Sequence, residues 1–130
     1  MMYRYFFRYK IPIPPVTKKN SQRILTGRRG NKYVAPSEQY ERYAKSAGWF
    51  IRPVPPKPID FPVTVKCLFF LPIARRTDLV NLLEAVCDIL VENRVLADDN
   101  YKIVASHDGS RCFVDREQPR TEIYIEEYKE

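Results

Sequence analysis

The run of residues from 61 to 71 most constrains the fold, because almost every position in it is apolar. Only Thr64 and Lys66 interrupt the apolar side chains. A strand shows such a run when both faces of its sheet are covered, so we expect a central strand here. Further strands are expected at residues 3–11, which are rich in aromatic residues, at 101–106, and at 121–127, whose clean alternation indicates one exposed face.

Residues 78–92 predict a helix with two different faces. On a helical wheel its Leu, Val and Ile side chains fall within an arc of about 120°, and its acidic residues fall opposite, broken only by Ala85. Thr77 or Asp78 would cap this helix. The remaining segments are read as a basic loop over 16–34, either with or without short strand pieces, a helix from about 36 to 50, a proline-rich linker over 53–58 and a hairpin turn at Asp108-Gly109.

These elements predict the fold class. Strands grouped at both ends of the chain, with two helices between them, favour an α+β fold. We expect one domain, residues 1–130, with a mixed, mostly antiparallel sheet and two helices packed on one of its faces.

The charge distribution is uneven along the chain. The net charge is +6, but residues 1–76 hold 16 Lys and Arg against 3 Asp and Glu, whereas residues 77–130 hold 6 against 13. A basic half joined to an acidic half indicates a polyanionic partner, such as nucleic acid, together with a separate cation-binding centre. The alternative is that folding interleaves the two halves into ordinary ion pairs.

Cysteine, histidine and hydropathy patterns exclude several classes of protein. The three cysteines, Cys67, Cys87 and Cys112, are dispersed and read as reduced, and one histidine is too few for a typical zinc site. His107 is interpreted as either a general base or a solvated turn residue. No apolar run approaches the roughly 20 residues that span a bilayer, and the N-terminus lacks a signal-peptide pattern, so we expect a cytoplasmic protein with no membrane partner.

Two acidic motifs flank the predicted helix. Arg75-Arg76-Thr77-Asp78 precedes it, and Asp98-Asp99 follows it. Neighbouring carboxylates repel unless a proton or a cation offsets them, and a hard divalent ion such as Mg²⁺ beside basic residues indicates phosphate chemistry. The alternatives are a solvated acidic helix face and an ordinary turn at 98–100.

At these residues the chain resembles the RusA-type Holliday junction resolvases. Their signature is Asp-x-Asp-Asn leading into a helix, then a paired Asp-Asp. Asp78 and Asn81 match the first part and Asp98-Asp99 the second, with 21 residues from Asp78 to Asp99. The Pro12-Ile13-Pro14-Pro15 segment with Asn20 and the closing strand at 121–127 also fit, so the resemblance extends over nearly the whole chain and implies a RusA-like fold.

The resemblance implies a site and two departures from it. Asp78 and Asp99 would be catalytic metal ligands, with Asp98 beside them, for Mg²⁺ or alternatively Mn²⁺. The family's second motif aspartate is Val80 here, and its helix lysine is Glu84. Because positions 80 and 84 lie on neighbouring helical turns, we hypothesise that Glu84 is a replacement catalytic and metal-binding carboxylate, and that a basic residue from elsewhere replaces the lysine.

The expected activity is Mg²⁺-dependent cleavage of four-way DNA junctions in recombination and repair, by a homodimer whose two-fold symmetry matches the junction. Tyr3, Tyr5, Phe6 and Tyr9 could cover the dimer interface. DNA contacts are predicted at Lys18, Lys19, Asn20, Arg28, Arg29, Arg75 and Arg76. The rival is a weak or inactive nuclease that binds junction or single-stranded DNA, in which Tyr33, Tyr40 and Trp49 either stack on bases or belong to the core.

Overall fold

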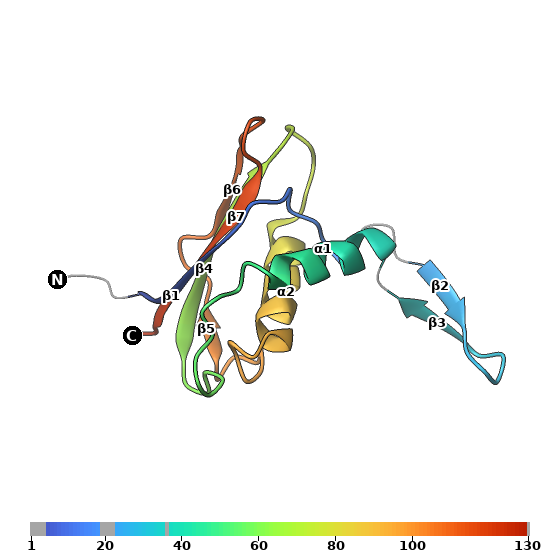
Figure 1. Ribbon diagram of the computed structural model, residues 1–130, viewed down its shortest axis with the longest axis horizontal. Helices are drawn as coiled ribbons and strands as arrows, with labels where there is room; N and C mark the ends of the chain where they lie inside the picture. The colour runs from blue at the N-terminus through green and yellow to red at the C-terminus, as the bar shows by residue number, and fades with distance from the viewer. Residues whose placement is uncertain (1–4, 19–22, 36, 130) are drawn as a thin grey trace.

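The computed structural model describes residues 5–18, 23–35 and 37–129, and its main sheet has the order β1-β7-β4-β5, with β6 also paired to β4 (Figure 1). The strands are β1 (Tyr5–Ile11), β2 (Arg23–Thr26), β3 (Lys32–Ala35), β4 (Val63–Leu71), β5 (Val104–Ser106), β6 (Arg111–Val114) and β7 (Arg120–Glu127). The helices are α1 (Glu38–Gly48) and α2 (Leu79–Glu92).

Strand β4 occupies the centre of the sheet, as its apolar run predicted. β7 pairs with one edge of β4 in antiparallel register, from Val63 opposite Glu127 to Phe70 opposite Arg120. β1 extends the sheet beyond β7, also antiparallel. Because the antiparallel pairs dominate and both helices lie on one side of the sheet (Figure 1), the α+β prediction is confirmed.

The other edge of β4 differs from the prediction. β5 and β6 follow one another along this edge, and both run parallel to β4. The turn between them, in which Gly109 has a φ of +86°, therefore does not reverse the chain, and the hairpin interpretation of Asp108-Gly109 was wrong. A turn signal predicts a local bend but not which strand the following residues will pair with.

The two helices form the second layer. α2 buries its predicted apolar arc, including Leu82, Val86 and Ile89, against the sheet. Ser37 caps α1 by accepting a hydrogen bond from the Tyr40 amide at 3.1 Å, and α1 buries Tyr40, Tyr43 and Ala47. Within the described residues, neither helix has the length and apolarity needed to cross a membrane.

The basic segment, for which a loop with or without short strands was predicted, contains a second sheet. β2 and β3 pair in antiparallel register from Arg23 opposite Ala35 to Thr26 opposite Lys32. Figure 1 shows this hairpin extending away from the main sheet, beyond α1. Each strand has only four residues, which is too few for alternation to distinguish a strand from a loop.

An ion cluster forms where β7 begins. The Arg120 guanidinium donates to Asp115 at 2.9 Å and to Glu122 at 2.8 Å, and lies over the Phe70 ring. A backbone hydrogen bond from Gln118 and the contact with Arg120 lower the pKa of Asp115. Burial opposes the shift at Glu122, but the hydrogen bond from Arg120 still lowers the pKa of Glu122. Both carboxylates are therefore stabilised in the ionised form.

All three cysteines are free thiols, which agrees with the prediction of reduced cysteines. Cys67 and Cys87 are buried, whereas Cys112 is exposed. Burial raises the pKa of Cys67 well above its usual value and that of Cys87 to about 12. The two buried thiols are neutral, apolar parts of the core.

Candidate active site at the start of helix α2

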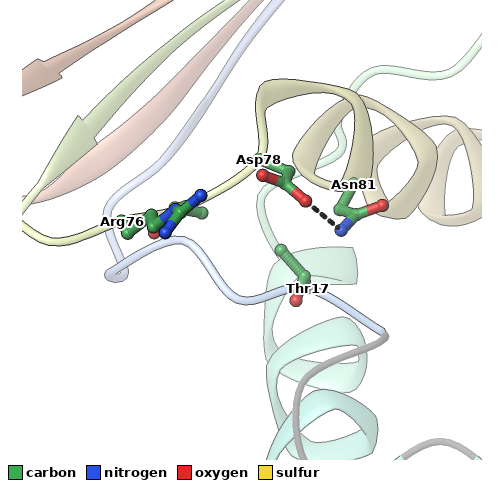
Figure 2. A pocket seen from close by; sticks show the side chains of 5 residues that line it. Thr17, Arg76, Asp78 and Asn81 are labelled. Atoms are coloured by element: carbon green, nitrogen blue, oxygen red, sulfur yellow. Dashed lines mark hydrogen bonds between the residues drawn. The ribbon is translucent and has the colours of Figure 1, made fainter.

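An open pocket of about 240 Å³ lies at the N-terminus of α2. It is lined by Thr17, Arg76, Thr77, Asp78 and Asn81. Figure 2 shows the Asp78 and Asn81 side chains above Thr17, with Arg76 on the loop that leads into the helix. The structure therefore places Arg76 and Asp78, both predicted from the sequence, at one pocket.

Asp78 begins α2 through its backbone. Its carbonyl oxygen accepts from the amides of Asn81 and Leu82 at 3.1 and 3.2 Å. The carboxylate makes no capping hydrogen bond to the helix, and instead accepts from the Asn81 side-chain amide at 3.3 Å (Figure 2). The Asn81 amide thus orients an exposed carboxylate at the pocket.

Positive charge also converges on this pocket. The Arg76 side chain is exposed, and the amides at a helix N-terminus carry a partial positive charge that favours anions. The buried Thr77 hydroxyl oxygen has no hydrogen-bond partner among the described residues. A phosphate would be attracted by the guanidinium and the helix terminus but repelled by Asp78, unless a cation lay between the two anions.

The Asp98-Asp99 pair forms a tight polar turn beyond the other end of α2. One Asp98 carboxylate oxygen accepts from the Asp99 amide at 2.7 Å and the other from the Asn100 side chain at 3.1 Å. These hydrogen bonds lower the pKa of Asp98. Partial burial, the contact with Asp98 and the charge of Asp88 raise the pKa of Asp99.

The predicted carboxylates are not all brought together. Asp99 lies near the Cys87–Asp88 part of α2, since its charge contributes to the raised pKa of Cys87. Asp88 is ten residues beyond Asp78, or about 15 Å along a helix axis. Glu84 is exposed between them on α2. In the described part of the chain, no three His, Cys, Asp or Glu side chains gather in an arrangement that could hold a metal ion.

Thr17 was missed as a pocket residue, and Asp88 as the residue that holds the neighbouring Lys18 in place. Lys18 donates to an Asp88 carboxylate oxygen at 2.7 Å, and this hydrogen bond raises the pKa of Lys18 although partial burial opposes the shift. The ion pair fastens the segment after β1 to α2, which places the neighbouring Thr17 at the pocket. The partners are 70 residues apart, so no local pattern could have paired them, although Asp88 did lie on the predicted acidic face.

His107 is neither free nor at the pocket. Its Nδ1–H donates to the Val65 carbonyl oxygen at 2.8 Å, and its Nε2 lies 4.0 Å from the Cys87 thiol. Because a carbonyl can only accept, Nδ1 carries the proton and Nε2 faces the sulfur. The partly buried ring therefore anchors the residues after β5 to β4, rather than standing in solvent as a turn residue would.

The remaining predicted contacts are dispersed over the surface. Arg28 and Arg29 lie in the β2–β3 turn and Arg75 on the loop before α2, all exposed. Lys19 and Asn20 lie outside the described residues. Of the aromatic residues, Tyr40 belongs to the core, whereas Tyr33 and Trp49 are 47% and 67% exposed.

Comparison with known proteins gives one family. The family described as endodeoxyribonuclease RusA matches residues 12–126, which is most of the 130-residue chain. The matched range includes the pocket at α2 and the Asp98-Asp99 turn. No curated protein matches the sequence. The family match confirms the resemblance found in the sequence.

Proposed function

The chain belongs to the RusA endodeoxyribonuclease family, and from this premise we propose that it is a Mg²⁺-dependent nuclease that resolves four-way DNA junctions. Family membership supports a Holliday junction endodeoxyribonuclease role in general. The observation that carries the finer proposal is the pocket in which Asp78, Arg76 and the α2 N-terminus meet. We further propose that it acts in the cytoplasm, in recombination and repair.

The metal proposal depends on how many protein ligands Mg²⁺ needs. A closed site of three carboxylates does not fit the described residues. Mg²⁺ is, however, usually held by one or two carboxylates together with water and substrate phosphate. The exposed oxygen ligands at Asp78 fit that chemistry, so we propose a site at Asp78 that is completed by water and the DNA phosphate. Asp99 and Asp98 are proposed as further ligands, but they lie near Asp88 in this structure, so they would join the same metal only if the turn after α2 moved toward Asp78. Mn²⁺ would be bound by the same ligands.

The mechanism assigns separate tasks to the residues of this pocket. Arg76 and the α2 N-terminus bind the phosphate and stabilise the charge that develops on its oxygens in the transition state. Asn81 holds the Asp78 carboxylate in one orientation. When bound, Mg²⁺ would lower the pKa of a coordinated water and act as a Lewis acid. Arg75, Lys18, Lys19, Asn20, Arg28 and Arg29 are proposed to hold the rest of the DNA.

Glu84 is the proposed replacement for the carboxylate absent at position 80. It is exposed on α2, one turn beyond Val80, and would reach toward a metal held near Asp78 or Asp99. The rival function is junction binding with little or no cleavage. The absence of a gathered carboxylate set in the described residues favours that rival, and a cleavage assay distinguishes the two.

A homodimer is proposed because two symmetric cuts need two symmetric active sites. β1 is an edge strand of the sheet, so it could contribute to a subunit interface. Tyr9 cannot serve as an interface side chain as predicted, because it is only 2% exposed and belongs to the core. Tyr3 lies outside the described residues, and Tyr5 and Phe6 remain predictions.

The experiment that tests this site compares four proteins on one labelled four-way junction, with Mg²⁺ and with chelator. The parent and the control Glu117→Gln should cleave only with Mg²⁺. The control removes an exposed carboxylate that does not line the pocket. Asp78→Asn and Asp99→Asn should bind the junction but lose most of their cleavage, because a neutral amide is a poorer ligand for a hard divalent cation than a carboxylate. Normal cleavage by either Asn variant would remove that carboxylate from the proposed site.

A further inference from the structure

The β2–β3 hairpin exposes apolar side chains that nothing in the described chain covers. Ile24 and Val34 lie opposite each other and are 71% and 63% exposed. Thr26 and Lys32, also exposed, continue the same face toward the turn. None of these residues belongs to the hydrophobic core. Because an isolated two-stranded hairpin is marginally stable in water, this face is suited to a partner.

The turn presents two arginines at the end of the hairpin. The Gly27 amide donates to the Asn31 carbonyl at 2.7 Å, and Gly30 has a φ of +79°, which favours glycine. Arg28 and Arg29 therefore occupy the tip, and both are exposed. Residues 23–35 contain four Arg and Lys residues and no Asp or Glu.

The basic tip and the small apolar face of the hairpin favour a polyanion such as DNA over a protein as the partner. A stable protein interface needs about 800 Å² on each side, whereas this face offers only four side chains, those of Ile24, Thr26, Lys32 and Val34. The major groove of DNA is about 12 Å wide and 8.5 Å deep and accepts a two-stranded β-ribbon. A four-residue strand rises about 13 Å, so the hairpin has the length to enter the groove and bring its tip to the far phosphates.

We propose that the β2–β3 hairpin is a DNA-binding arm that enters the major groove of one duplex arm of the junction. Arg28 and Arg29 contact phosphates across the groove, and Ile24 and Val34 make apolar contacts with base edges, for which thymine methyl groups are suitable partners. The inference rests on the proposed function only in taking branched DNA as the substrate, and it does not require cleavage.

The test measures junction binding in chelator, so that the DNA stays intact, as a function of salt. Each phosphate contact contributes about 0.9 to the slope of log K against log salt. The double variant Arg28→Ala/Arg29→Ala should therefore lower the slope by about 1.8. The control Arg116→Ala/Lys129→Ala removes the same charge from exposed positions elsewhere and should leave the slope unchanged.

A second readout locates the arm. Bound parent protein should protect guanine N7, which lies in the major groove, from methylation by dimethyl sulfate on one duplex arm. Ile24→Ser/Val34→Ser should lose this protection and weaken binding without changing the salt slope. An unchanged salt slope in Arg28→Ala/Arg29→Ala, or unchanged guanine protection in Ile24→Ser/Val34→Ser, would overturn the arm while leaving the nuclease proposal intact. A shift from dimer to monomer in sedimentation would instead identify a second copy as the partner, and failure of the parent to bind any junction would overturn both proposals.

Discussion

Restoring a carboxylate at position 80 tests whether the departure from the family signature limits activity. Val80 is 72% exposed in the first turn of α2. Fully burying a valine contributes roughly 1.5–3 kcal/mol, so Val80→Asp, which removes a side chain that is less than a third buried, should lose no more than about 0.4–0.8 kcal/mol of unfolding free energy. A carboxylate near a helix N-terminus gains about 0.3–1 kcal/mol. The two effects offset, and the melting temperature should change by no more than about 3 °C.

The activity should change far more than the stability. A second carboxylate two residues from Asp78 would share in holding Mg²⁺, and we expect junction cleavage to rise about tenfold, which corresponds to about 1.4 kcal/mol of transition-state stabilisation. Single-turnover cleavage of a labelled four-way junction at several Mg²⁺ concentrations measures this change. Val80→Asn is the matched control, because it has nearly the same shape without the charge.

Two results would refute the reasoning. Equal cleavage by the parent, Val80→Asp and Val80→Asn would mean that the missing carboxylate does not limit the reaction. An equal gain in Val80→Asn would mean that polarity, rather than charge, is responsible. Neither result would count against Glu84, because a Glu84 carboxylate that already replaces the one absent at position 80 would itself make a new carboxylate there redundant.

Three other predictions concern the surrounding structure. Lys18→Ala should lower the free energy of unfolding in denaturant by less than about 1 kcal/mol, because the ion pair of Lys18 with Asp88 is partly exposed. The variant should nevertheless cleave more slowly, because the segment that carries Thr17 at the pocket is no longer fastened to α2. Unchanged cleavage would contradict this. Arg120→Ala should flatten the pH dependence of the melting temperature. Asp115 and Glu122 stabilise the fold above their unfolded pKa values of 3.8 and 4.5, and this contribution is lost as the pH falls through their lowered folded pKa values. Superimposable pH profiles for the parent and the variant would refute this reasoning. Cys112 should react first with a thiol reagent, and a second fast thiol would contradict the burial of the other two.

The elements predicted correctly from the sequence are those whose pattern is local and long. The apolar run of β4, the alternation of β7 and the two faces of α2 each extend over eight residues or more, so burial could be read from the spacing. Short strands were left open as an alternative for the basic segment, but their pairing was not predicted, because each strand is short and its apolar residues occur as adjacent pairs, Ile24-Leu25 and Tyr33-Val34. The parallel pairing of β5 and β6 depends on β4, which lies far away in the sequence.

The candidate site also contains residues that a local motif predicted and residues whose position depends on distant parts of the chain. Arg76, Asp78 and Asn81 are neighbours in the sequence, so a short motif predicted their meeting at one helix end. The position of Asp99 depends on how the chain turns after α2, where Arg94 has a positive φ of 64°. In the structure this turn brings Asp99 near Asp88 rather than Asp78. The ion pair from Lys18 to Asp88 joins opposite parts of the chain, and charge patterns along a sequence do not specify such partners.

Cleavage of a four-way junction and of a linear duplex with the same sequence, each with Mg²⁺ and with chelator, is the most direct test of the proposed function. The products would be resolved as single strands on a denaturing gel. We expect paired nicks at symmetric positions in the junction, only with Mg²⁺, and none in the duplex. Tight junction binding without cleavage in either Mg²⁺ or Mn²⁺ would contradict the proposal and would leave a DNA-binding protein with a nuclease fold.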